Sequence, residues 1–328
     1  MPAAPIVTIF GGSGFLGRYV TQRFARAGWR IRVAVRRPNE AHFVRPYGVV
    51  GQVEPIQANV RDEASTRRAI DGASVVINCV AIGFEDTKGR VTEVQEEGSE
   101  RIARIAAETG ASQLVHVSAI GADTESDSYY SSTKGSGEAA VLEHFPSAAI
   151  IRPSIMFGNE DKFYNRFANM ARFMPVLPIV GAETKFQPAY VDDVAAAIVA
   201  AVDQNKSGVF ELGGPEVQTF REMMLDMLDV TRRRRLILNL PMPIARVMAS
   251  ILDFVQFISF GWIPNVMITR DQIKNLAVDN VVAEDAQGFD ALGITPRSSD
   301  GILETYLYSF RQYGQYTELT ESAKGLRD

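Results

Sequence analysis

The sequence predicts an α/β fold in which a doubly wound parallel sheet is joined to a smaller, mainly helical C-terminal lobe. Three observations support this prediction. Extended, β-prone segments alternate with helical patterns through the first half of the 328-residue chain, a glycine-rich turn joins the first strand to the first helix, and the second half loses this alternation. Strands that alternate with helices lie parallel in one sheet, because each helical crossover returns the chain to the same end of the sheet.

The first half is predicted to form strands and helices in alternation, each bounded by turn residues. A strand at residues 6–10 is followed by a helix at about 16–27, which Gly28 ends. The alternation continues with strands at 31–35, 75–80, 113–118 and 148–152 and with helices near 62–70, 93–109 and 134–145. Right-handed crossovers between parallel strands are the expected connection.

The second half is less regular. The prolines at positions 175, 178 and 188 interrupt the pattern, and the next elements are a helix starting at 190–195, a strand at 209–212 and a helix around 220–229. We therefore expect a sheet domain of residues 1–157, to which residues 187–214 return. Residues 158–186 and 215–328 are expected to form the smaller lobe.

The turn after the first strand carries the strongest functional signal. Its glycines are spaced Gly11-x-x-Gly14-x-x-Gly17 and lead directly into the first helix. Gly11 permits the tight turn, Gly14 lets the backbone approach a pyrophosphate, and Gly17 lets the helix pack close to the sheet. Free N–H groups at the helix start attract phosphates. The strand, the spacing and the helix agree, so the sequence predicts a Rossmann-type dinucleotide-binding domain.

The end of the second strand indicates which dinucleotide is bound. NAD-binding proteins usually carry an Asp or Glu there to hold the ribose hydroxyls. This chain has Arg36 and Arg37 instead, and Arg18 follows the last glycine of the turn. A guanidinium binds a 2′-phosphate through charge-assisted hydrogen bonds that a carboxylate would oppose. We therefore expect NADPH or NADP as the cofactor, with NAD less favoured.

A second candidate site lies downstream, in Tyr130-Ser-Ser-Thr-Lys134. Residues four apart lie on one face of a helix, so the Lys134 ammonium can lower the pKa of the Tyr130 phenol and reach a cofactor ribose. Tyr-x-x-x-Lys alone is a weak motif in a chain with 10 tyrosines. Its place, directly after the strand that ends at Ser118, gives it weight.

At this point the chain resembles the extended short-chain dehydrogenase/reductase superfamily over about residues 5–215. The likeness rests on the glycine turn, on Asn59-Val-Arg-Asp62, on Asn78-Cys-Val-Ala81, on the Tyr130/Lys134 pair and on Arg152-Pro-Ser-Ile155. It implies that these segments surround the cofactor. The cofactor-binding residues expected from the turn, the arginines and the resemblance are Gly11, Ser13, Gly14, Phe15, Leu16, Gly17, Arg18, Arg36, Arg37, Asn59, Val60, Val80, Ala81, Ser118, Tyr130, Lys134, Pro153 and Ile155.

The chain departs from that superfamily at one position. Working members often carry a Ser-Ser pair after the fourth main strand, and the second serine holds the substrate oxygen. Here Ser118 is followed by Ala119. Either Ser118 replaces the missing donor, so that Ser118, Tyr130 and Lys134 form a catalytic set, or the set is vestigial and the site binds cofactor without fast chemistry.

Within the superfamily, the whole chain is similar to the NADPH-binding accessory subunits of respiratory complex I, in bacterial form. The similarity includes residues 116–122, 157–163, 279–282 and 292–296. It implies a tightly held structural NADPH and docking on the peripheral arm of that complex near the membrane. A freestanding NADP-dependent reductase, epimerase or dehydratase is the alternative function, and a redox-sensing binding module is a weaker third one.

Composition excludes several other functions. A net charge of −5 disfavours a nucleic-acid partner, which normally requires a basic face. Cys79 is the only cysteine, and the three histidines lack metal-ligand spacing, so no metal site is expected. The first strand begins close to Met1, which leaves little room for a targeting segment. We expect a cytoplasmic protein, attached peripherally to the cytoplasmic side of a bacterial inner membrane if it belongs to complex I.

The stretch near 243–264 is apolar at helical spacing, but Arg246 and Asp253 interrupt it and argue against a membrane-spanning helix. It either packs against the smaller lobe or lies against lipid or a partner, with Arg232–Arg235 near lipid head groups. The likeness to the complex I subunits favours the second interpretation.

Overall fold

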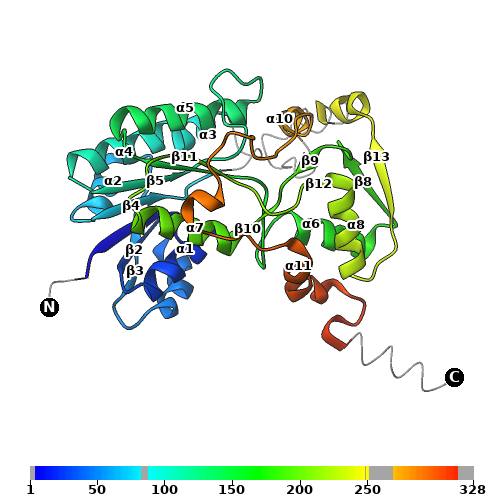
Figure 1. The fold of residues 1–328 in the computed structure, drawn as a ribbon, viewed down its shortest axis with the longest axis horizontal. Helices are drawn as coiled ribbons and strands as arrows, with labels where there is room; N and C mark the ends of the chain where they lie inside the picture. The colour runs from blue at the N-terminus through cyan, green and yellow to red at the C-terminus, as the bar shows by residue number, and fades with distance from the viewer. Residues whose placement is uncertain (1–3, 83–87, 248, 251–268, 317–328) are drawn as a thin grey trace.

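The computed structural model describes residues 4–82, 88–247, 249–250 and 269–316, and Figure 1 shows the arrangement of their elements. A parallel seven-stranded sheet runs in the order β11-β6-β5-β4-β1-β2-β3. Its strands are β1 (Ile6–Phe10), β2 (Arg30–Val35), β3 (Val53–Gln57), β4 (Val75–Asn78), β5 (Gln113–Val117), β6 (Ala149–Pro153) and β11 (Gly208–Leu212). The predicted fold class is confirmed.

Helices cover both faces of the sheet (Figure 1). One face carries α1 (Phe15–Arg26) and α7 (Val191–Asp203), and the other carries α2 (Glu63–Ile70), α3 (Lys88–Gln95), α4 (Glu97–Glu108) and α5 (Tyr129–His144). Strand β1 shows why two helical layers form: Val7 and Ile9 pack against α1 and α7, whereas Phe10 packs on the opposite side. Every second side chain of a strand points to the same face, so a strand that is apolar throughout needs a cover on both faces.

The order of strands reverses between β1 and β4. From β1 the chain builds β2 and β3 on one side and then crosses to build β4, β5, β6 and β11 on the other. Ligands of open parallel sheets bind beyond the carboxyl ends of the strands at such a reversal. The topology therefore places a binding crevice above the ends of β1, β2 and β4.

The smaller lobe has its own core, which includes Tyr164, Leu177, Met223, Met227 and Leu303. Its elements are β7 (Met156–Phe157), α6 (Tyr164–Phe173), β8 (Val176–Val180), β9 (Lys185–Phe186), β10 (Ala189–Tyr190), β12 (Gln218–Thr219), α8 (Phe220–Val230), β13 (Leu236–Leu240), α10 (Arg270–Asn275) and α11 (Ser299–Leu307). Short strand pairs accompany the helices here. Pro178 lies within β8, which pairs only with β13 in the described structure, and a strand with one open edge tolerates a residue without an N–H.

After α10 the chain returns to the sheet domain. Residue 287 forms a bridge with Phe210 of β11, and the Glu211 N–H donates to the Gln287 carbonyl at 2.9 Å. Phe289 and Leu292 are buried in the core between the sheet and helices α1 and α7. At the end of this returning segment, Arg297 forms a salt bridge with Asp192, at 2.9 Å, and another with Asp193. Residues 280–297 therefore contact both parts of the molecule.

Part of the apolar stretch near 243–264 is described. Residues 242–247 and 249–250 are helical, and Ala245 and Ala249 are buried beside Val180 and Ile273. Ile244 and Val247 are 57% and 61% exposed. Residues 248 and 251–264 lie outside the described residues. Across the parts of the chain that are described, no helix is both long enough and apolar enough to cross a bilayer.

Candidate functional site

The glycine turn has the geometry that the sequence predicts. Gly11 has φ +73°, a left-handed conformation that favours glycine, and Gly14 caps α1 in an extended conformation. A Cβ at Gly17 would lie 2.2 Å from the Gly11 carbonyl oxygen, so only glycine lets α1 start this close to the turn. A Cβ at Gly14 would meet only that same oxygen, at 3.1 Å. The remaining side of Gly14 is open, and it faces a cavity.

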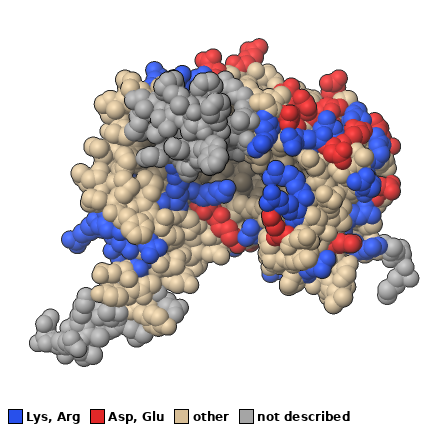
Figure 2. All heavy atoms as spheres, turned by 180° about the vertical axis from the view of Figure 1, so that it is seen from behind, with Lys and Arg blue, Asp and Glu red and all other residues tan. Residues whose placement is uncertain are grey.

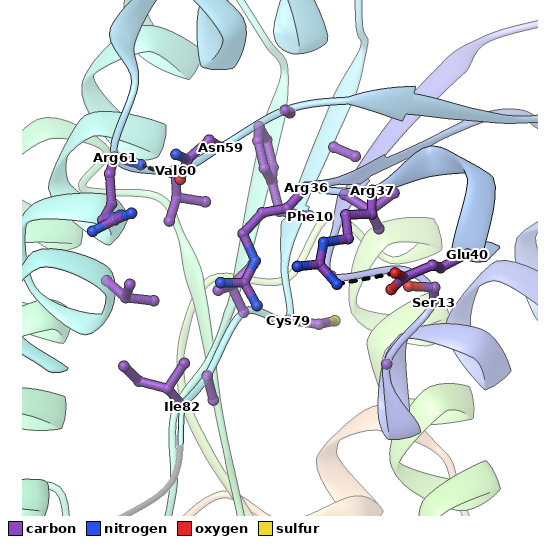
Figure 3. Close-up of a pocket in the computed structure, with 18 of the residues that line it drawn as sticks. Phe10, Ser13, Arg36, Arg37, Glu40, Asn59, Val60, Arg61, Cys79 and Ile82 are labelled. Atoms are coloured by element: carbon purple, nitrogen blue, oxygen red, sulfur yellow. Dashed lines mark hydrogen bonds and ion pairs between the residues drawn. The ribbon is translucent and has the colours of Figure 1, made fainter. Parts of the chain in front are cut away.

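This cavity has a volume of about 500 Å³ and lies beyond the carboxyl ends of β1 to β4 (Figure 3). The predicted cofactor residues that line it are Gly11, Ser13, Gly14, Arg36, Arg37, Asn59, Val60, Val80 and Ala81. Four chain segments that lie far apart in the sequence thus meet in one cavity. Its size is within the range of small-molecule and cofactor sites.

The cavity is strongly basic. Its charged lining residues are Arg36, Arg37, Glu40, Arg61 and Arg90. Arg37 donates to Glu40 at 3.0 Å, and Arg61 donates to Glu93 at 2.8 Å. Arg36 has no ion-pair partner among the described residues, and Figure 3 shows its guanidinium pointing into the middle of the cavity. An open backbone at Gly14 and a free guanidinium at Arg36 fit a pyrophosphate and a 2′-phosphate.

The four predicted cofactor residues at the start of α1 lie outside this lining. Leu16 is buried in the core and Gly17 packs against the turn, so both support α1. The Phe15 ring lies beside Gly158. The Arg18 guanidinium donates to the Gly14 carbonyl at 3.2 Å, forms a salt bridge with Glu160 at 3.2 Å and lies 5.0 Å from the centre of the Phe43 ring. Arg18 is thus engaged in contacts that hold the turn.

Lys134 lies beneath the end of β5. Its ammonium donates to the Val117 carbonyl at 3.2 Å, and the side chain is buried. Burial lowers the pKa of Lys134 to about 8. Burial also raises the pKa of Tyr130, one turn earlier on α5, to about 12, so the expected lowering of this pKa by Lys134 is wrong. Cys79 lies between this region and the cavity, which it lines. The positive charge of Lys134 lowers the pKa of the Cys79 thiol, but burial has the larger effect and raises this pKa to about 12.

Ser118 is buried, and its hydroxyl has no hydrogen-bond partner within the described part of the chain. A buried hydroxyl without a partner costs free energy unless a ligand supplies one. Its backbone N–H donates to Ile151 of β6 at 2.7 Å, which fixes the end of β5. This orphaned hydroxyl is therefore a second observation that fits a ligand, on the nicotinamide side of the expected cofactor.

The sequence does not indicate that His116 and Asn78 contact each other. The Asn78 amide donates to His116 Nδ1 at 3.1 Å and to Ser99 at 3.2 Å, and its carbonyl accepts the Val80 N–H at 3.1 Å. Burial lowers the pKa of His116 to about 3, so the imidazole is neutral. Together these contacts fix the end of β4 beside the cavity.

Pro153 and Ile155 do not line the cavity. They flank Ser154, whose hydroxyl donates to the Asn280 carbonyl at 3.1 Å, and Ile155 packs on the core of the smaller lobe. The preceding residue, Arg152, donates three hydrogen bonds to the Glu138 carboxylate of α5, at 2.9, 3.2 and 2.6 Å. The segment 152–155, which the resemblance places beside the cofactor, is thus attached to the helix that carries Tyr130 and Lys134.

The buried Lys134 ammonium predicts a protein that becomes more stable as the pH rises. Its pKa is about 8 in the fold and 10.5 without the protein's influence, so between these values the unfolded chain binds more protons. Stability is gained through this window and lost as the pH falls through it. Between pH ~7.5 and ~9.5, urea unfolding of the cofactor-free protein should show a gain of about 2 kcal/mol that Lys134→Met lacks.

The matched control for this experiment is Lys162→Met, because Lys162 is exposed. It should retain the pH dependence of the wild type. A difference between wild type and Lys134→Met that stays constant with pH would contradict a buried ammonium at this position.

Comparison of the sequence with known proteins identifies the family of this chain. The model of the RmlD substrate binding domain matches residues 6–253. The chain is 35% identical to NADH dehydrogenase (ubiquinone) 1 alpha subcomplex subunit 9, mitochondrial, of Arabidopsis thaliana, over 97% of this chain and 81% of that protein. It is 31% identical to the NADH-ubiquinone oxidoreductase 40 kDa subunit, mitochondrial, of Neurospora crassa, over 94% of this chain and 80% of that one.

Enzymes are also among the similar proteins. The chain is 30% identical to ceramide reductase of Caulobacter vibrioides, over 76% of this chain and 78% of that enzyme. The dTDP-glucose 4,6-dehydratase of Streptomyces venezuelae, solved with NAD and TYD bound, has the same fold, with a TM-score of 0.70, 15% identity and coverage of 92% and 95%. The family match and these identities confirm that the chain belongs to the extended short-chain dehydrogenase/reductase family described by the RmlD substrate binding domain.

Proposed function

We propose that this protein is an NADPH-binding accessory subunit of respiratory complex I, in which the cofactor mainly stabilises the fold. The observation that carries the proposal is the similarity to two subunits of NADH–ubiquinone oxidoreductases over at least 94% of this chain. The similarity includes the C-terminal part, which lies beyond the match to the family model at residue 253. The basic cavity supports the choice of cofactor.

The cofactor residues divide into two groups. The Gly11–Gly17 turn would hold the pyrophosphate and Arg36 the 2′-phosphate, while Lys134 would hold the ribose hydroxyls on the nicotinamide side. NADPH supplies a hydride when it reacts, but a tightly held dinucleotide also stabilises the fold that binds it. At a concentration of 1,000 times the Kd, this stabilisation amounts to about 4 kcal/mol.

Arg36→Asp tests the choice of cofactor. The substitution removes the free guanidinium of the cavity and places a carboxylate where the 2′-phosphate would bind. We expect NADPH to bind about 30-fold more weakly, with the affinity for NADH changed less than twofold, in calorimetric titrations. Arg45→Asp is the control, because it changes the net charge equally at an exposed position outside the cavity lining. Equal losses for NADPH and NADH would contradict the assignment.

The smaller lobe supplies the surface that we propose for docking on the peripheral arm near the membrane, on the cytoplasmic side of a bacterial inner membrane. Exposed apolar side chains on it are Phe173, Leu236, Leu238, Ile244 and Val247. The guanidiniums of Arg233 and Arg235 donate to main-chain carbonyls, and neither forms an ion pair with another described residue. Figure 2 shows Lys and Arg side chains at the edge of this lobe, on the left of the view. Basic and apolar groups side by side suit lipid head groups, with residues 243–264 as a further lipid contact.

Native purification from membranes tests the assembly. The protein should copurify with complex I, and mass spectrometry of the washed complex should detect NADPH in proportion to this chain. Recovery of the protein free of the complex, together with fast turnover of NADPH on small carbonyl compounds, would refute the proposal.

A freestanding NADP-dependent reductase, epimerase or dehydratase remains the second candidate. The orphaned Ser118 hydroxyl favours it, and so does the similarity to ceramide reductase. Here Tyr130 would transfer its phenol proton to the substrate oxygen, and Ser118 would orient that oxygen. This function requires carbonyl-dependent NADPH consumption that Tyr130→Phe abolishes, and it fails if the wild-type protein shows none.

A further inference from the structure

The helix that carries Tyr130 and Lys134 begins on a carboxylate from a distant part of the chain. Asp271 of α10 accepts three hydrogen bonds at the start of α5: from the Ser128 hydroxyl at 3.1 Å, from the Tyr129 N–H at 2.8 Å and from the Tyr130 N–H at 3.0 Å. Figure 1 shows α10 near the end of α5. One side chain thus binds both backbone N–H groups of the first two residues of α5.

Two further contacts fix α10 in this place. The Ser131 hydroxyl donates to the Asn275 side-chain carbonyl at 3.0 Å, and the Lys274 ammonium donates to the Asp127 carbonyl at 2.7 Å. Helix α10 itself starts with a capping box between Thr269 and Gln272, so its orientation is defined locally. Asp271 is therefore held against α5 from several sides.

Helix α5 has an N-cap of its own, because the Ser128 hydroxyl accepts the Ser131 N–H at 3.4 Å, but the N–H groups of Tyr129 and Tyr130 are bound by Asp271. The first N–H groups of a helix lack partners within the helix, and a negative charge is favourable at this end. The first turn of α5 contains no acidic residue of its own. Gly135 and Gly137 lie within the helix, where close backbone neighbours exclude a Cβ. Both glycines lower the intrinsic stability of the helix, because glycine loses more backbone freedom on folding than other residues do. Asp271 supplies the missing negative charge.

We infer that Asp271 is a positioning residue, which holds Tyr130 and Lys134 in place for the nicotinamide half of the bound cofactor. The inference rests on the proposed function, since it concerns the same cofactor site. Asp271 lies beyond residue 253, where the match to the family model ends, so the contact is contributed by the C-terminal part of the chain. The adenosine half of the site, formed by the β1 to β4 ends, does not depend on it.

Asp271→Ala tests the inference in the full-length protein, with two ligands. NADPH occupies both halves of the site, whereas adenosine 2′,5′-bisphosphate occupies only the adenosine half. Losing this cap should weaken NADPH about fivefold and leave the bisphosphate unchanged. Asp279→Ala is the matched control, because the Asp279 carboxylate also lies in the C-terminal part but accepts the Lys185 N–H, in the smaller lobe, at 2.8 Å. It should affect neither ligand.

Hydrogen exchange in the absence of cofactor provides an independent measurement. The amides of residues 129–131 should exchange about fivefold faster in Asp271→Ala than in the wild type or in Asp279→Ala. Unchanged exchange at these amides, or equal weakening of both ligands, would overturn the inference. A wild-type protein that binds neither ligand would overturn the proposed function instead, and the exchange rates would then decide the role of Asp271.

Discussion

Gly17→Ala should abolish tight dinucleotide binding and lower the free energy of unfolding by about 3 kcal/mol. The added Cβ would lie 2.2 Å from the Gly11 carbonyl oxygen and 2.7 Å from the Gly12 Cα. Both neighbours are backbone atoms, so no side chain can rotate away and α1 itself must move. The movement would displace the N–H groups of the turn, which are the groups that the pyrophosphate requires. Calorimetry with NADPH and urea unfolding measure the two effects.

Gly301→Ala is the matched control. Gly301 lies inside α11, and a Cβ there meets nothing within 4 Å. Because alanine is the better helix former, this variant should be slightly more stable than the wild type and should bind NADPH normally. Normal NADPH binding by Gly17→Ala would show that the close approach of α1 to the turn is not needed.

Glu138→Gln should destabilise the protein by about 3 kcal/mol, because it leaves a partly buried guanidinium with only its longer ion pair, to Glu211. Glu138 is 5% exposed and accepts three hydrogen bonds from Arg152, at 2.9, 3.2 and 2.6 Å. The same arginine donates to Glu211 at 3.4 Å, and Glu211 also accepts the Ala283 N–H at 3.0 Å. The substitution therefore weakens a network that joins α5, β6, β11 and the returning C-terminal segment.

Glu63→Gln provides the comparison for an exposed network. Glu63 contacts Arg104 at 2.7 Å and Arg67 at 3.1 Å on the surface of α2. Exposed ion pairs contribute little, so its loss should cost less than about 1 kcal/mol in urea unfolding. Similar losses for Glu63→Gln and Glu138→Gln would contradict the importance assigned to burial.

The sheet domain could be predicted because its signals are local. Each strand of the first half is a short apolar run beside a helical pattern, and the glycine spacing specifies both the turn and the start of α1. Strand β3 and the short pair β8/β13 were not predicted. Pro55 and Pro178 interrupt their apolar patterns, and Leu236 and Leu238 of β13 are exposed, so burial gives no periodic signal there.

The site could be predicted where the strand ends supply the residues, as for Gly14 and Arg36. Arg90 was missed as a lining residue, since nothing in its local sequence shows that it faces a cavity, and Arg61 was included only as part of the segment 59–62. Asp271 was missed for a related reason. It lies 141 residues from Tyr130, and no local pattern connects a capping carboxylate with a helix so far away in the chain.

The returning segment at residues 280–297 has a consequence for synthesis on the ribosome. The side of β11 and the α1/α7 core are completed by residues such as Phe289 and Leu292, which are translated after all seven strands of the sheet. The nascent chain must therefore keep an unfinished apolar surface until residues 280–297 have emerged from the exit tunnel. Chaperones that shield such surfaces during translation should engage this protein late, and release it only when Arg297 has reached Asp193.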